Sequence, residues 1–377
     1  YSTVSQVAYI VVGVAMFAPM LVGAHFSARS DIDPRAMVFV TELALLPVSA
    51  LMTALVFTGA VPMWMVYPFE LAYGFGGMVN MTAQRELLFR ISGPLRAARV
   101  LNVEVTSMAA AMMLGPLLGG LSISTFGLGE AFLVPAVLLT GSVVLFWIAT
   151  RRLQLPPAPL LAAEPVRRGT DWRLPSRSPA LGLILLVTVI CNLCYFAFLP
   201  LVPVIADHLD AGPAMAGVIG AAAGVAQLVV AGSLVVWPVR RPFLAYAGGV
   251  ALCLCSLGIV ATTPLLIVTL AALGIAGIGQ ALFGSTQATL PVGAVAVHER
   301  AAALGLLSTT IGLALPSGML ILGVMSSLLG AERAMLVSAL TGLATLAATL
   351  LVGRRYVGRP VLGEAACGGG EGDPVAA

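Results

Sequence analysis

Eleven apolar stretches of about 20 residues constrain the fold of this chain more than any other feature. A helix of that length spans the roughly 30 Å hydrocarbon layer of a bilayer. Because 59% of the 377 residues are hydrophobic and only 9% are charged, a water-soluble fold could not cover this much apolar surface. We therefore predict an all-α polytopic membrane protein, with helices over residues 5–24, 38–58, 61–82, 101–125, 129–149, 181–206, 213–236, 242–261, 264–288, 302–327 and 332–352.

An internal repeat relates the two halves of the chain. A shift of 203 positions places seventeen residues on identical partners without a gap, including Gln84 on Gln287 and Gly127 on Gly330. Such a repeat predicts two pseudo-symmetric helix bundles. The same shift puts the partner of the helix at 181–206 before residue 1, so we expect a native count of twelve helices, of which the first is missing here.

Charge and proline mark the boundaries of the two bundles. The segment 150–180 carries six arginines and is rich in proline, so it is too polar to cross the bilayer and too broken to form one long helix. We assign residues 1–149 to an N-terminal bundle, 150–180 to a cytoplasmic linker, 181–352 to a C-terminal bundle and 353–377 to a disordered cytoplasmic tail. With the linker inside, eighteen of the nineteen arginines face the cytoplasm, which predicts a multi-pass protein of the bacterial cytoplasmic membrane.

A segment rich in small residues follows an arginine-rich connection in the first half. Its residues are Ala111, Gly115, Pro116, Gly119 and Gly120. Glycine lets a neighbouring helix approach closely and proline removes a helix hydrogen bond, so the segment should be bent and tightly packed. The pattern resembles the antiporter motif of exporters in the major facilitator superfamily, with alanine in place of the motif's first glycine. Its flanking residues resemble the drug-efflux and siderophore-export branches.

This resemblance implies a secondary transporter whose two six-helix bundles rock about a central cavity. It further implies export of a small, fairly apolar molecule in exchange for protons, by a monomer in the lipid bilayer. Uptake or uncoupled facilitated diffusion by the same fold is the alternative within transport. A non-transporting sensor, or a remnant without its first helix, is the alternative outside it.

In the family, an acidic and a basic residue after the second helix form a latch between cytoplasmic helix ends, and this chain lacks that pair at the corresponding positions. The family reads Gly-x-Leu-Ala-Asp-Arg where this chain has Gly-Ala-His-Phe-Ser-Ala-Arg. The residues that could replace the latch are Asp31, Asp33, Arg85, Arg96 and Glu104. Arginines that only set the orientation of the chain are the simpler interpretation.

Three acids fall inside the predicted helices, where ionisable groups are costly and are candidates for function. Glu70 lies about nine residues into the helix at 61–82, near the membrane midplane. We expect it to bind a proton or a cationic substrate, and a structural carboxyl paired with a polar neighbour is the alternative. Glu42 and Glu104 lie near the cytoplasmic helix ends, so we expect them to be interfacial partners of arginines.

The second half has polar residues but no charge at mid-membrane. Asn192 and Tyr195 share one face of the helix at 181–206, and Gln227 and Gln280 lie on two further helices. These four could hydrogen-bond a bound molecule among apolar walls. Hydrogen bonding between helices is the alternative for each.

The sequence carries no motif for catalysis or for a cofactor. No phosphate-binding loop, nucleophile elbow or paired-cysteine metal motif occurs. Four of the five cysteines are interpreted as small packing residues, and the fifth lies in the polar tail. The arginines are dispersed rather than gathered into a patch, which argues against nucleic-acid binding. We therefore predict neither an enzyme nor a metal or cofactor site.

Overall fold

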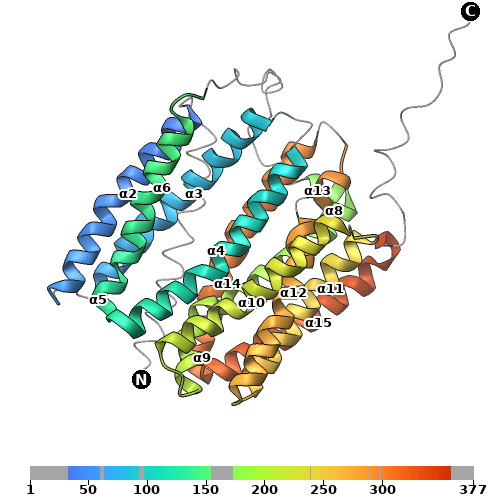
Figure 1. Cartoon of the computed structure of the whole chain (residues 1–377). Coiled ribbons are helices and arrows are strands. Elements are labelled where there is room, and N and C mark those ends of the chain that lie inside the picture. Colours follow the sequence, from blue (N-terminus) through green and yellow to red (C-terminus); the bar gives the residue numbers. More distant parts are fainter. Residues whose placement is uncertain are drawn as a thin grey trace, which may run out of the picture.

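The computed structural model describes residues 33–59, 63–92, 97–153, 173–237, 239–287, 289–296 and 299–357. The predicted helix at 5–24, most of the linker and most of the tail lie outside these ranges. Every regular element in them is helical (Figure 1). The elements are α2 (Pro34–Phe57), η1 (Met63–Met65), α3 (Val66–Ser92), α4 (Ala97–Phe126), α5 (Leu128–Ala131), α6 (Leu133–Thr150), α7 (Leu174–Arg177), α8 (Pro179–Ile190), η4 (Cys191–Tyr195), η5 (Phe196–Leu201), α9 (Val202–His208), α10 (Pro213–Val236), α11 (Pro242–Thr262), α12 (Leu266–Gln287), α13 (Thr289–Gly293), α14 (Arg300–Leu329) and α15 (Ala331–Val357).

Nine spans in the described part of the chain are long and apolar enough to cross a membrane. They correspond to nine of the eleven predicted helices. Of the other two, the helix predicted at 61–82 is α3, which is not among the nine, and the helix predicted at 5–24 is not described. The prediction of an all-α polytopic membrane protein is thereby confirmed.

The repeat of 203 positions is visible in the helices themselves. Helix α4 begins at Ala97 and ends at Phe126, and α14 begins and ends 203 positions later. After each of them the chain turns at a glycine with positive φ, 98° at Gly127 and 87° at Gly330. An L side chain is strained at such angles, so the repeated glycine is required by the backbone of the turn.

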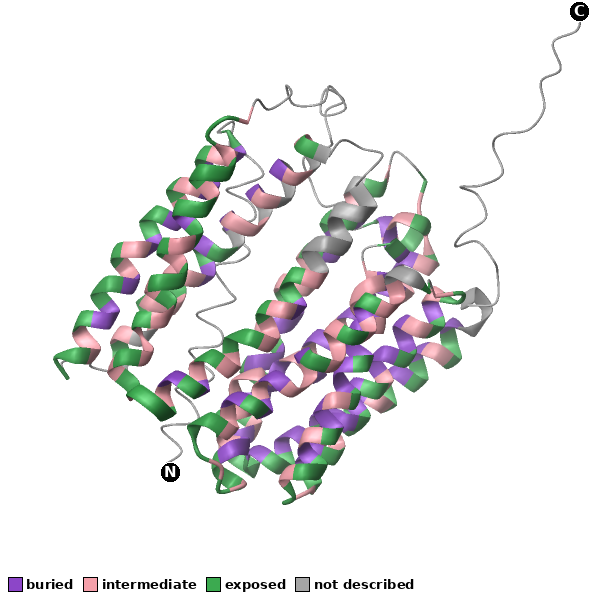
Figure 2. Ribbon diagram, viewed as in Figure 1, coloured by how far each residue is buried: buried purple, intermediate pink, exposed green. Residues whose placement is uncertain are grey.

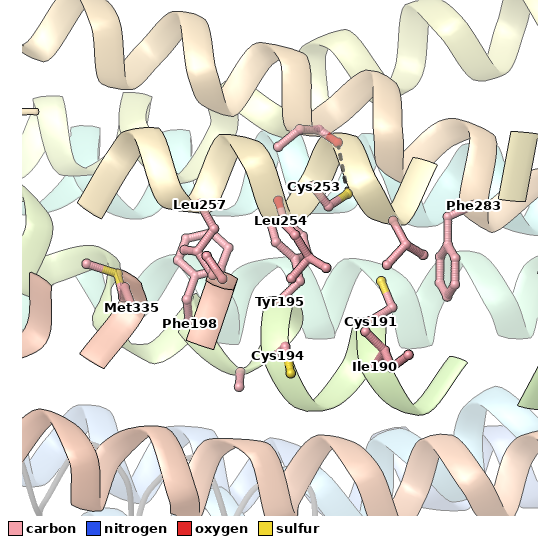
Figure 3. Close-up of a cluster of buried hydrophobic side chains, with 14 of the residues drawn as sticks. Ile190, Cys191, Cys194, Tyr195, Phe198, Cys253, Leu254, Leu257, Phe283 and Met335 are labelled. Atoms are coloured by element: carbon pink, nitrogen blue, oxygen red, sulfur yellow. Dashed lines mark hydrogen bonds between the residues drawn. The ribbon is translucent and has the colours of Figure 1, made fainter. Parts of the chain in front are cut away.

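The helices from α8 to α15 share one large hydrophobic core. Helix α11 packs against α12 and α15, and α10 packs against α12. Aromatic rings fill the centre of this core, where Tyr246 and Phe283 stack with their centroids 4.8 Å apart. Figure 3 shows Tyr195 and Cys253 within the same cluster, and the Cys253 thiol contacts the carbonyl of Ala276. Figure 2 shows the buried residues concentrated in these helices.

In the first half, α2 packs against α3 and α6 around a smaller core of Met37, Val38, Val79 and Ala83. Helix α4 makes few contacts with these helices and instead lies along α10 of the second half (Figure 1). Exposed apolar side chains cover much of α2 and α6, as expected of surfaces that face lipid.

The helix predicted at 181–206 is broken at its centre. Between α8 and α9 the chain forms the π-helical turn η4 and the 3₁₀ turn η5. Proline donates no backbone hydrogen bond, and Pro200 and Pro203 therefore cannot continue a regular α-helix through this stretch. The carbonyl of Cys194 accepts a hydrogen bond from the Ser338 hydroxyl at 2.9 Å, which holds the widened turn against α15.

Candidate functional site

Helices α4 and α10 meet through glycine, and we call this contact the α4–α10 seam. A methyl group added to Gly217 would lie 2.5 Å from the Pro116 carbonyl oxygen, and one added to Gly120 would lie 2.5 Å from that of Pro213. One added to Gly224 would lie 2.8 Å from Cα of Met113. Only glycine permits backbones to approach this closely. The seam joins a helix of the first half to a helix of the second.

The antiporter-like segment divides between two faces of α4. Pro116 and Gly120 contact α10, as the sequence predicted for a tightly packed segment. Gly115 and Gly119 face open space, because a methyl group on either would meet nothing within 4 Å. Ala111 is exposed. The structure therefore brings only part of the segment into the seam.

A small pocket opens beside the seam. Its walls come from α4, η5, α9, α10 and α12, so both halves of the chain contribute to it. The lining residues are Met112, Phe198, Leu199, Val202, Ile219, Gly220, Ala223, Gly224, Leu273 and Gln280. All of them are apolar except Gln280, whose amide supplies the polar group of this wall.

The structure brings only two of the four predicted cavity residues of the second half into contact with each other. The Gln280 amide nitrogen donates a hydrogen bond of 2.8 Å to the Tyr195 hydroxyl, and both side chains are buried. The Asn192 amide donates back to the carbonyl of Thr188 on its own helix at 2.9 Å. The side-chain oxygen of Gln227 is buried and has no hydrogen-bond partner within the described part of the chain. Tyr195 and Gln280 therefore form one unit, while Asn192 and Gln227 remain separate from it.

Glu70 lies closer to a helix end than the sequence suggested. Helix α3 begins at Val66, so Glu70 is its fifth residue, and its side chain is only partly buried. One turn further along, the hydroxyl of Tyr73 is buried without a partner in the described structure. Glu70 thus occupies the first turns of α3 rather than its middle.

Glu42 differs most from the expectation. We expected it at the membrane interface with an arginine, but α2 begins at Pro34, so Glu42 is the ninth residue of the helix, and only 3% of it is exposed. The Asn80 amide donates to its Oε1 at 3.2 Å. The Ser142 hydroxyl lies 3.2 Å and 3.1 Å from its two carboxyl oxygens. These contacts join α2, α3 and α6 at one carboxyl group.

Among the latch candidates, Asp33 has a partner on its own helix. Arg35 forms an ion pair of 2.8 Å with Asp33 and donates to the carbonyl of Leu153 just beyond the end of α6. Asp33 also caps α2 by accepting from the backbone of Arg35 at 2.9 Å. These hydrogen bonds from Arg35 are the main reason why the pKa of Asp33 lies below its ordinary value. Asp31, Arg96 and the side chains of Arg85 and Glu104 lie outside the described structure.

The family model described as Major Facilitator Superfamily matches residues 2–314. A search of curated proteins finds no matching relative. Two similar solved structures are crystal structures of a bacterial homolog to the human lysosomal transporter Spinster. The inward-facing, unoccupied one is 12% identical with a TM-score of 0.66, covering 94% of this chain and 95% of its own. The occupied one is 14% identical with a TM-score of 0.63 and covers 93% and 95%.

A third similar structure is the human organic anion transporter MFSD10 (TETRAN). It is 16% identical, has a TM-score of 0.60 and covers 91% of this chain and 82% of its own. At these identities the likeness concerns the fold alone.

Proposed function

Because the chain belongs to the Major Facilitator Superfamily, we propose that it is a secondary transporter that exports a small, fairly apolar molecule across the cytoplasmic membrane in exchange for protons. The family consists of membrane transporters with an alternating-access fold. Export, proton exchange and the class of substrate are the parts that we add.

The α4–α10 seam carries the proposal. Alternating access requires a contact between the halves that closes in one state and opens in another. Pro116 and Gly120 belong to the antiporter-like segment, and both lie against α10 at backbone distances. The resemblance to exporters thus falls on the residues that join the two halves, which favours export over uptake.

The pocket beside the seam supports the class of substrate. Apolar side chains make up its walls, and Gln280 is its polar member. Such a lining suits a neutral or weakly polar molecule with one hydrogen-bonding group, because an anion would find no charge to replace its hydration shell there. The Tyr195 hydroxyl holds the Gln280 amide in place.

Glu70 is the proposed coupling group. A carboxyl that is partly buried in a membrane helix can exchange a proton with water at the membrane surface. Its place in the first turns of α3 puts it within reach of the outer side, if the arginine-rich helix ends face the cytoplasm.

The test uses inside-out vesicles that contain the purified protein, a pH gradient and a panel of fluorescent apolar compounds. We expect the wild type to accumulate at least one compound when the interior is acid. Glu70→Gln should abolish this accumulation while the thermal stability of the protein is kept, and the exposed Glu130→Gln should serve as the matched control. A wild-type flux that does not change with the pH gradient would instead support facilitated diffusion.

A further inference from the structure

Among the described residues, Glu42 is the only acidic side chain that is buried. Removing a carboxylate from water is costly unless hydrogen bonds or a cation compensate for it. Its two hydrogen-bond partners, Asn80 and Ser142, are both neutral. These polar groups hold the carboxyl in place, and no cation among the described residues contacts it.

In the described structure, no charged or titratable group on the neighbouring elements contacts Glu42. Arg35, two turns before Glu42 on α2, is paired with Asp33. Helices α3, α5 and α6 pack against α2. Their titratable and charged groups in the described structure are Tyr67, Glu70, Tyr73 and Arg90 on α3, Glu130 on α5, and Arg151 and Arg152 after α6. None of these forms an ion pair or hydrogen bond with Glu42.

The contacts of Glu42 suit both protonation states without rearrangement. A serine hydroxyl can donate or accept a hydrogen bond, so Ser142 can donate to the carboxylate or accept from the protonated acid by turning its hydrogen. Asn80 can donate to Oε1 in either state. Gaining a proton forms one O–H bond on the carboxyl, and losing it returns the proton to water. No heavy atom has to move.

A row of hydrogen bonds on α3 runs from this carboxyl through Asn80 to Gln84. The Gln84 amide donates to the Asn80 side-chain oxygen at 3.3 Å, which orients the Asn80 nitrogen toward Glu42. Residues 70, 73, 77, 80 and 84 follow a spacing of three and four, so Glu70, Tyr73, Gly77, Asn80 and Gln84 lie on one face of α3. Gln84 is the member nearest to the arginine-rich end of that helix.

We propose that Glu42 is a proton-binding site, whose carboxyl Ser142 and Asn80 hold in both protonation states and whose Asn80 contact is oriented by Gln84. The inference rests on the proton exchange proposed above and adds a second site to it. Glu70 and Asn80 are ten residues apart on α3, or about 15 Å along the helix axis, so Glu70 and Glu42 cannot share one proton directly.

Infrared difference spectroscopy of the purified protein in lipid tests this site without a known substrate. One component of the carbonyl band of protonated carboxyls should grow as the pH falls in the wild type, and that component should be missing in Glu42→Gln. The amide keeps the hydrogen bonds to Ser142, so this variant should fold, and thermal unfolding checks that it does. Glu70→Gln should retain the band.

A second variant tests the partner. Ser142→Ala removes a donor to the carboxylate, so the midpoint of the band should rise by about one pH unit. Thr140→Val serves as its control, because in the described structure the Thr140 hydroxyl donates to the carbonyl of Ala136 in the same helix and not to Glu42. Glu42→Gln and wild-type spectra that coincide at every pH would overturn the site, as would a Glu42 band that never titrates. If the Glu42 band titrates but transport does not depend on the pH gradient, the proton-binding site is supported and the proposed proton exchange is refuted.

Discussion

The close approach of α4 and α10 makes Gly217→Ala an informative substitution. The added methyl group would lie 2.5 Å from the Pro116 carbonyl oxygen and 3.0 Å from Cα of Gly120. Both are backbone atoms, which cannot swing aside as the end of a flexible side chain can. Ordinary contact begins near 3.4 Å, so the two helices must separate by about 1 Å.

Overpacking of this kind costs about 1–3 kcal/mol. The cost falls only on states in which the seam is closed, because Gly217 belongs to the second half of the chain and its two neighbours belong to the first. The ratio of closed to open molecules should therefore fall by about 5- to 150-fold. In a transporter with nearly balanced states, the open fraction would then rise from about 50% to between about 83% and 99%.

Distances between spin labels report this shift directly. Labels at the exposed positions Phe126 on α4 and Ala214 on α10 flank the seam, once accessible native cysteines are replaced. We expect longer distances to gain population in Gly217→Ala. Gly115→Ala is the matched control, because its methyl group meets nothing within 4 Å. A distance distribution that is the same in Gly217→Ala and the wild type, with normal thermal stability, would refute the reasoning.

Two further predictions concern the second half. Tyr195→Phe leaves the Gln280 amide buried without its acceptor and should destabilise the protein by about 1–3 kcal/mol. Adding Gln280→Leu to this variant should recover part of the lost stability. Additive effects of the two substitutions in a double-mutant cycle of thermal unfolding would contradict this. Gly318→Ala should lower the unfolding temperature because its methyl group would meet the backbone of Leu193, and a tolerated substitution would show that η4 yields easily.

The sequence predicted the helices and the repeat, but the structure starts α2 and α3 at other residues than expected, which changes the distance of Glu42 and Glu70 from the helix ends. Asp33 followed by Pro34 is a signal for the beginning of a helix, and reading it would have placed Glu42 two turns inside α2 rather than near its end. Pro68 is tolerated in the first turn of a helix but not in its interior, which would have moved the start of α3 toward Val66. Apolar composition alone could not locate either boundary.

The pairing of Tyr195 with Gln280 could not be predicted in the same way. These residues are 85 positions apart, and their contact depends on how far the π-helical turn η4 rotates the residues after it. Spacing along a regular helix placed Tyr195 with Asn192 instead. Long-range contacts of this kind come from the packing of helices that no local pattern specifies.

The repeat also hides a difference in how the two halves use equivalent residues. Gly115 and Gly318 are related by the shift of 203 positions, yet Gly318 packs on the backbone of Leu193 in its own bundle while Gly115 faces open space. In the first half, the residues that pack closely are instead Pro116 and Gly120, and they contact the opposite half. The same small-residue pattern thus holds a bundle together in one half and joins the two halves in the other. Sequence symmetry is consistent with both uses, because glycine fixes only that a close approach is possible and not which helix makes it.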